Sequence, residues 1–140
     1  MAGNRTYYIY PDNSLSTEER FVMQQGYPYV STTVLRPHGR LNYHGHHSRN
    51  THFIVNGTLN IARANNPNSA FVPWTRWQTH GPRTFANMPR IATYIGEAGA
   101  EGCTFVEGHA QLSPTTADRF AARGTIVPVP RGTPGSFTTT

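Results

Sequence analysis

Glycine and proline interrupt this sequence every few residues, which favours short elements joined by turns. The 140 residues include 13 Gly and 11 Pro, the two residue types most often found in turns. Hydrophobic residues make up 36% and charged residues 14%, both below the values usual for globular domains. The pattern predicts a β-rich, turn-rich fold. A chain of this length typically forms one compact domain, which we place at residues 1–131, with a polar C-terminal tail at 132–140.

Short runs of β-branched, aromatic and apolar residues indicate strands. The strongest local signal is Asn56-Gly57 between two apolar runs, which predicts a hairpin within residues 52–62. A turn is expected at residues 96–102, and an edge strand before Pro130. The predicted strands lie at residues 27–36, 52–62, 91–95, 103–109 and 126–129.

Two short helices are expected at the periphery. Residues 14–25 begin with Ser and Thr, carry Glu18 and Glu19 in the first turn, and end before Gly26. Residues 113–123 begin with Ser and Pro and end before Gly124. Both patterns are typical of capped helices. Residues 71–80 fit neither the helical nor the strand period, so we expect an irregular segment there.

Charge and cysteine content narrow the classes of function. The net charge is +5, with 12 basic residues against 7 acidic ones, and all the basic residues are arginines. These arginines are scattered singly along the sequence, which disfavours a nucleic-acid surface. Cys103 is the only cysteine, so no intramolecular disulfide forms and a cytoplasmic location is expected. The sequence contains neither an apolar run of about 18 residues nor an N-terminal secretion signal, so we expect no association with membranes.

Four of the seven histidines lie within nine residues, namely His44, His46, His47 and His52. Residues two apart share a face of a strand, so His44 and His46 can present two imidazoles to one metal ion. By the same alternation His52 shares a face with Asn50 and is a possible third ligand. Zinc, iron, manganese, nickel and copper all accept such ligands. Alternatively, the cluster is a set of polar surface imidazoles beside a turn.

This segment resembles the first motif of the cupin family, G-x5-H-x-H-x3,4-E-x6-G. Gly39, His44, His46, Asn50 and Gly57 stand near that spacing, with one residue fewer after Gly39 and Asn50 in place of the glutamate ligand. The resemblance implies an all-β fold, an antiparallel jelly-roll barrel, with the histidines lining its interior. It also implies a bound divalent transition metal and a homodimer.

The second cupin motif, G-x5-P-x-G-x2-H-x3-N, is matched only weakly. Pro89 is present, but Ile91, Tyr94 and Ala98 replace the glycine, histidine and asparagine. Two of the four family ligands are thus Asn50 and Tyr94, whose amide and phenol groups are poor ligands for such metals. His52, His80 or His109 could replace them, and a metal-free site is the alternative.

The predicted strand at residues 103–109 places Phe105, Glu107 and His109 on one face. A buried Glu beside a His can transfer protons, because each tunes the pKa of the other. Alternatively, Glu107 pairs with an arginine at the rim. Tyr94 could donate a hydrogen bond to a substrate oxygen, or it could simply pack in the core.

Residues around the two tryptophans are candidates for contacting a substrate. Trp74 and Trp77 could form a lid over a pocket, with Arg76 available to an anionic substrate, or they could plug the end of the barrel. Cys103 is expected to be a small core residue. Serine-hydrolase, phosphate-loop, dinucleotide-binding and zinc-finger motifs are absent from the sequence.

Two classes of function remain open. The first is a cupin-like enzyme, an oxygenase or an isomerase or cyclase, that acts on a small aromatic or polyketide-like molecule inside the barrel. Its chemistry is either metal-assisted oxygenation or isomerisation, or metal-free isomerisation, cyclisation or dehydration by His44, His46, Tyr94 and Glu107. For substrate contacts we expect Asn50, Trp74, Arg76, Trp77 and Phe105. The second class is a non-catalytic β-barrel that binds a ligand or assembles with copies of itself.

Overall fold

The computed structural model describes residues 6–9, 15–45, 49–64, 74, 76–88, 93–111, 126–128 and 136–138. Side chains are described for residues 15–41, 49–64, 74, 76–87 and 93–111. The described part contains one helix, α1 (Thr17–Gln24). The strands are β1 (Thr6–Ile9), β2 (Tyr29–Leu35), β3 (Arg40–Gly45), β4 (Asn50–Arg63), β5 (Gln78–His80), β6 (Phe85–Met88), β7 (Thr93–His109), β8 (Ile126–Pro128) and β9 (Ser136–Thr138).

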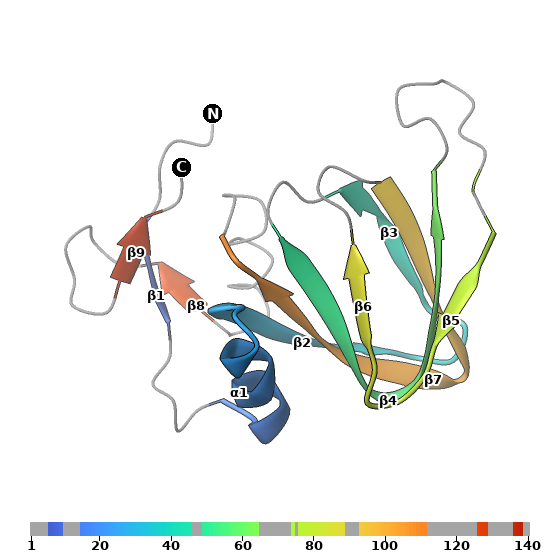
Figure 1. The fold of residues 1–140 in the computed structure, drawn as a ribbon, viewed down its shortest axis with the longest axis horizontal. Coiled ribbons are helices and arrows are strands. Elements are labelled where there is room, and N and C mark those ends of the chain that lie inside the picture. The colour runs from blue at the N-terminus through green and yellow to red at the C-terminus, as the bar shows by residue number, and fades with distance from the viewer. Residues whose placement is uncertain are drawn as a thin grey trace.

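Every strand pair in the described part is antiparallel, and the strands form two sheets. The larger sheet has the order β2-β7-β4-β5, with β3 also paired to β7 and β6 also paired to β4. The smaller sheet has the order β8-β1-β9 and lies on the left in Figure 1. This arrangement confirms the predicted all-β, antiparallel fold with a short helix.

A bend in the long ribbon of β4 and β7 shapes the larger sheet. Residues 50–57 of β4 pair with residues 103–109 of β7, and residues 59–63 pair with residues 94–98, with register shifts between the two parts. Gly57 and Gly102 lie at the bend with φ angles of +75° and +80°, a conformation that glycine adopts without strain. The ribbon therefore folds back on itself and gives the sheet two arms (Figure 1).

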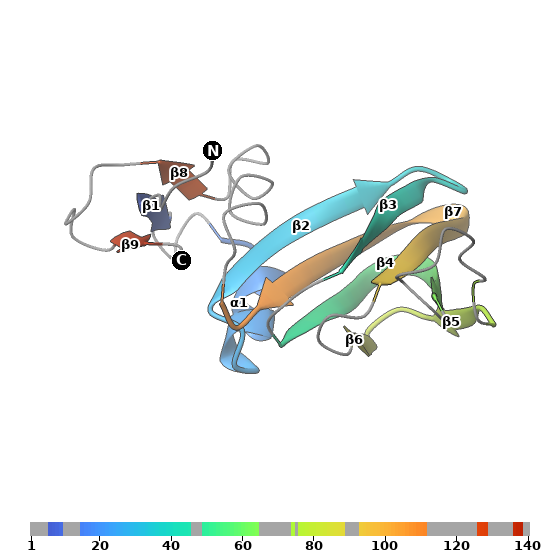
Figure 2. The same ribbon diagram turned by 90° about the horizontal axis from the view of Figure 1, so that it is seen from above.

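We call these the helix arm and the outer arm. The helix arm consists of β2, β6 and residues 50–57 and 103–109 of the ribbon, whereas the outer arm consists of β3, β5 and residues 59–63 and 94–98. Figure 2 shows α1 against the β2 end of the sheet, far from β5. The strands of the two arms thus lie on either side of the bend.

Two hydrophobic clusters occupy the two faces of the helix arm. The inner cluster lies between the arms and is built from Ile54, Leu59, Ile61, Ala86, Tyr94, Ala98, Cys103 and Phe105. The second cluster lies under α1 and contains Leu15, Val22, Tyr27, Val30, Phe53 and Val106. Ile54 and Phe53 therefore point to opposite faces, as strand alternation predicts.

The N-terminal helix forms as its sequence predicts. Ser16 accepts a hydrogen bond from the backbone N–H of Glu19, and the Glu19 carboxylate accepts one from the backbone N–H of Ser16. This reciprocal capping box fixes the helix start. Val22 is the residue of α1 that is fully buried, so it anchors the helix on the sheet. The second predicted helix, at residues 113–123, lies outside the described residues.

Two predicted turns are wrong. β4 continues through Asn56 and Gly57, and β7 continues through residues 96–102. The positive φ that a tight turn requires is present at Gly57, but there it serves the bend of a paired ribbon and does not reverse the chain. Gly102 has the same conformation on the partner strand.

The other local predictions have mixed outcomes. The strand predicted at residues 27–36 is confirmed as β2, and the short edge strand near residue 126 is confirmed as β8. Strand β5 lies within the segment expected to be irregular, and β3 and β6 were not predicted. β9 lies within the expected polar tail, and the division into domain and tail stays a prediction. No helix of the described part is long and apolar enough to cross a bilayer.

Candidate functional site

Strand register gathers polar residues on the inner face of the helix arm. Glu107 of β7 pairs with Ser31 of β2 and with His52 of β4. His109 pairs in the same way with Tyr29 and Asn50. Because directly paired residues of antiparallel strands share a face, these side chains form two adjacent rows facing the outer arm.

Most of this group is removed from solvent. We define the inner polar cluster as Ser31, Asn50, His52, Tyr94, Glu107 and His109, each of which is at most 2% exposed. Buried polar groups are stable only when they bond to one another or to water. The cluster adjoins the inner hydrophobic cluster, of which Tyr94 is also a member. It is the main concentration of buried titratable side chains in the described part of the chain.

A carboxyl group and an imidazole meet inside the cluster. Oε2 of Glu107 lies 2.5 Å from Nε2 of His109, and both side chains are 2% exposed. A hydrogen bond between these two atoms requires a proton on one of them, either the imidazole or the carboxyl group. The sequence predicts that these residues share a face, and the structure confirms that they are in contact.

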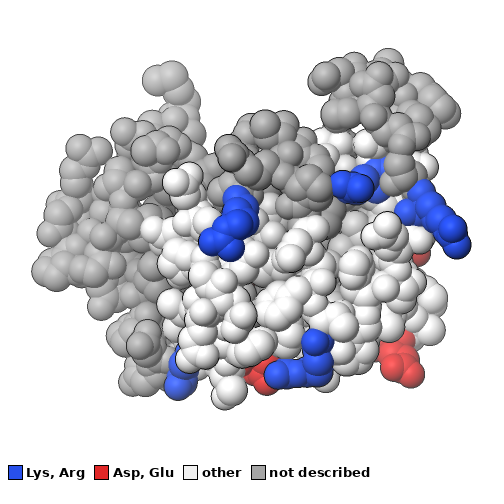
Figure 3. Space-filling model, viewed as in Figure 1, with Lys and Arg blue, Asp and Glu red and all other residues white. Residues whose placement is uncertain are grey.

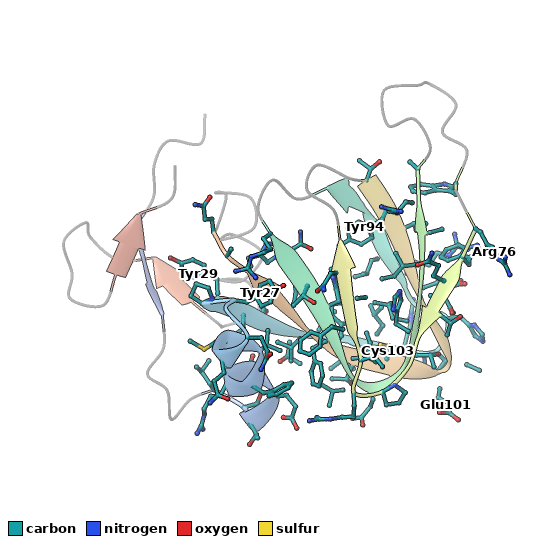
Figure 4. The ribbon with its side chains drawn as sticks, viewed as in Figure 1. Tyr27, Tyr29, Arg76, Tyr94, Glu101 and Cys103 are labelled. Atoms are coloured by element: carbon teal, nitrogen blue, oxygen red, sulfur yellow. The ribbon has the colours of Figure 1, made fainter. Side chains whose placement is uncertain are left out.

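A second pair spans the two arms. The Tyr94 hydroxyl lies 3.1 Å from Nε2 of His52, and the rings meet edge to face with centroids 5.7 Å apart. His52 also packs against Phe105, with ring centroids 5.1 Å apart. Tyr94 comes from the outer arm and His52 from the helix arm, so the bend of the ribbon brings them together. Figure 4 shows Tyr94 on the outer arm beside β3.

The described residues do not assemble the predicted metal site. His44 lies in β3 with its backbone opposite Tyr94, but its side chain and the whole of His46 lie outside what the structure describes. Nε2 of His52 faces Tyr94, and Nε2 of His109 faces Glu107, so a metal ion bound through either atom would have to displace that contact. Among the described residues, no group of three or more His, Cys, Asp or Glu could hold a metal ion. The metal site therefore stays a prediction.

The remaining candidate ligand, His80, lies on β5 and is only partly buried. Its backbone pairs with Leu59 in the outer arm. Burial lowers the pKa of the His80 imidazole below its usual value, which favours the neutral ring. The described contacts do not join it to His52 or His109.

The tryptophan segment lies at the outer edge of the sheet. Trp74 is 37% exposed and Trp77 is 41% exposed, which argues against a buried plug. Trp74 forms an isolated bridge with Ala64, and Figure 4 shows Arg76 at the outer edge beside β5. Of the five residues predicted to contact a substrate, Asn50 and Phe105 are buried. The other three, Trp74, Arg76 and Trp77, are exposed at the outer edge. Their roles in binding stay predictions.

Cys103 is part of the inner hydrophobic cluster and is 4% exposed. Burial raises the pKa of its thiol to about 11, so the thiol is protonated at neutral pH and is a poor nucleophile. The expectation of a small core residue is confirmed. Charged side chains elsewhere are dispersed, and Figure 3 shows the basic residues of the described part scattered over the visible face.

Sequence reasoning missed Ser31 and the contact between His52 and Tyr94. Ser31 stands in a predicted strand, but its position beside Glu107 depends on the pairing of β2 with β7. The contact with Tyr94 depends on the bend at Gly57. The pairing has no local signal in the sequence, and the signal at Asn56-Gly57 fits a hairpin as well as a bend, whereas the spacing of Glu107 and His109 puts them on one face directly.

Comparisons with known proteins gave matches among solved structures only. No protein-family model matches the sequence, and no curated protein matches it. Among solved structures, a variant of oxalate decarboxylase from Bacillus subtilis matches with a TM-score of 0.49 and 15% identity, over 62% of this chain and 22% of that chain.

Two further solved structures match with lower TM-scores. Drosophila melanogaster CENP-C bound to CAL1 matches with a TM-score of 0.46 and 7% identity, over 57% of this chain and 62% of that chain. The N-terminal domain of a transcriptional regulator from Streptomyces coelicolor matches with a TM-score of 0.39 and 19% identity, over 80% and 83%. This chain thus spans about a fifth of the decarboxylase.

Proposed function

We propose that this protein is an enzyme that moves protons on a small organic molecule bound between the two arms, and so catalyses an isomerisation, cyclisation or dehydration. The observation that supports this proposal is the buried contact between Glu107 and His109. A carboxyl group and an imidazole that share a proton away from water can act as general acid and general base in turn. When Nε2 of His52 carries a proton and donates it to the Tyr94 oxygen, the Tyr94 hydroxyl is left to donate its own proton to a substrate oxygen.

The proposed reaction assigns a separate task to each group. With the shared proton on His109, the Glu107 carboxylate accepts a proton from a substrate carbon next to a carbonyl group. Tyr94 donates a hydrogen bond to the oxygen on which negative charge develops, and this stabilises the enolate. His109 or Glu107 then returns a proton to a second position of the substrate. The aromatic rings of Phe105 and His52, which are packed together, favour a planar, aromatic or polyketide-like substrate.

Deuterium exchange tests the proposal without knowledge of the natural substrate. We would incubate the protein in D₂O with a panel of conjugated ketones and phenolic ketones, and follow incorporation of deuterium next to the carbonyl by NMR. The Glu107→Gln variant should lose about 100-fold or more of the exchange rate, the usual contribution of a general base. Tyr94→Phe should lose less, because one hydrogen bond to the oxygen is removed.

The matched control is Glu97→Gln. Glu97 forms an exposed ion pair with Arg40, at 3.1 Å, and its replacement should leave exchange unchanged. Exchange that proceeds equally in Glu107→Gln and Glu97→Gln contradicts the proposal. Saturable binding of panel members with no exchange in any of them supports the alternative class, a β-barrel that binds a ligand without catalysis.

The metal-assisted form of the reaction is tested separately. If His44, His46 and His52 hold a divalent transition metal, the ion supplies Lewis-acid polarisation of a substrate oxygen and opens the way to oxygenation. Elemental analysis of untagged protein should then find about one equivalent of metal, and the double variant His44→Ala/His46→Ala should lose it. If neither the wild type nor the double variant contains metal, even after attempted reconstitution, the metal-assisted form is contradicted and the acid–base form is the one to pursue.

A further inference from the structure

Behind the pair of Glu107 and His109, Tyr27 contacts both Gly108 and Arg49. Gly108 lies between Glu107 and His109, and its backbone faces α1 and the start of β2. A methyl group on Gly108 would lie 2.7 Å from Cγ1 of Val22 and 2.8 Å from Cβ of Tyr27. The helix and Tyr27 therefore rest directly on the β7 backbone at this residue.

Arg49 adds to these contacts. Its guanidinium lies over the Tyr27 ring, 4.5 Å from the ring centroid, and donates a hydrogen bond of 2.8 Å to the carbonyl oxygen of Gly26. The carbonyl oxygen of Arg49 accepts a hydrogen bond of 2.9 Å from the backbone N–H of Ala110. Arg49 thus contacts the chain on both sides of His109. On one side it holds Tyr27, which packs on Gly108, and on the other its carbonyl oxygen bonds to the N–H of Ala110.

We infer that Arg49 is a positioning residue for His109, and we call Tyr27, Arg49 and Gly108 the clamp. The inference rests on the proposed function, because it gives the clamp the task of holding the imidazole against the Glu107 carboxylate. His109 lies at the end of β7 and pairs there with Asn50, the residue after Arg49. Strand ends fray easily, so a proton-transfer pair at such a place needs a fixed backbone.

The geometry explains why an exposed arginine acts on a buried pair. The Arg49 side chain is exposed, yet one of its contacts is with Tyr27, which is 7% exposed. A cation over an aromatic ring and a charge-assisted hydrogen bond each contribute modestly to stability. Both interactions join Arg49 to the segment of Gly26 and Tyr27, which covers Gly108. Their combined effect is therefore local to this part of β7.

The test compares two arginines with similar ring contacts. Arg83 lies over the rings of Phe53 and Phe21, 4.8 Å and 5.8 Å from their centroids, at the turn before β6 and away from His109. Arg49→Met and Arg83→Met each remove one guanidinium from an aromatic surface. Arg49→Lys keeps a cation and a hydrogen-bond donor near Gly26, and serves as the conservative variant if Arg49→Met does not fold.

The first readout is the proton shared by Glu107 and His109, observed by NMR in protein with ¹⁵N-labelled histidine. We expect its exchange with solvent to be about tenfold faster in Arg49→Met, because local opening of the strand end controls that exchange. In Arg83→Met it should match the wild type, and in Arg49→Lys it should lie between the two. Equal exchange in Arg49→Met and Arg83→Met overturns the inference.

The second readout is the deuterium-exchange reaction on the substrate. We expect kcat to fall about tenfold in Arg49→Met with KM unchanged, since small displacements of a reacting group cost rate more than affinity. The two readouts separate the two proposals. Faster exchange of the shared proton in Arg49→Met, together with full activity in Glu107→Gln, supports the clamp and contradicts the proposed function. A fall in kcat that is the same for Arg49→Met and Arg83→Met contradicts a positioning role for Arg49.

Discussion

Replacing Gly57 with alanine should destabilise the protein strongly, because the bend of the ribbon leaves no room for a side chain there. Gly57 has a φ of +75°, and an L-residue in this conformation costs about 1–2 kcal/mol. A Cβ atom would also collide with the carbonyl oxygen of Gly102 and lie 2.9 Å from its carbonyl carbon. These are backbone atoms, so the two strands would have to separate, at a further cost of about 1–3 kcal/mol.

The total loss is about 2–5 kcal/mol, measured by urea denaturation followed by circular dichroism. For a chain of this size it corresponds to a fall in Tm of roughly 10 °C. The matched control is Gly81→Ala. Gly81 has no positive φ, and a Cβ atom added there would have no neighbour within 4 Å among the described residues, so its variant should be neutral or slightly more stable. Gly57→Ala with the same free energy of unfolding as Gly81→Ala would refute the close approach at the bend.

Two further predictions concern buried groups. Oγ1 of Thr51 is buried and makes no hydrogen bond within the described part of the chain, so Thr51→Val should stabilise the protein by about 1 kcal/mol; a lower midpoint in urea would contradict this. The Cys103 thiol ionises near pH 9.0 in the unfolded chain and near pH 11 when folded, so the folded state retains the proton longer. The free energy of unfolding should therefore fall as the pH rises from 9 to 11, and it should fall less in Cys103→Ala than in the wild type. The same dependence of this free energy on pH in both proteins would contradict the prediction.

Prediction from sequence succeeded where a property depends on neighbouring residues of one strand. Glu107 and His109 are two apart, so alternation alone puts them on the same face, and they are in contact in the structure. The capped start of α1 is equally local, since Ser16 and Glu19 are three residues apart. Such features need no knowledge of which strands pair.

Prediction failed where one conformation serves two purposes. The positive φ favoured at Asn56-Gly57 suits a two-residue hairpin, but it suits a bulge in a bent ribbon equally well. What decides between them is whether the chain after Gly57 pairs with the chain before it or continues along β7, and β4 continues along β7. The same pairing decides whether His52 meets Tyr94, so the error at the bend and the missed contact have one cause.

The composition of the inner polar cluster is itself an argument for function. Residues at these positions are not needed for a stable core, because replacing buried ion pairs with apolar side chains is often neutral or stabilising. The chain has few hydrophobic residues, yet it places His52, Glu107 and His109 beside Ile54 and Phe105, where apolar groups would pack well. Two contacts within the cluster, between Glu107 and His109 and between His52 and Tyr94, lie where the two arms meet, and the proposed function gives these groups the task of exchanging protons with a bound molecule.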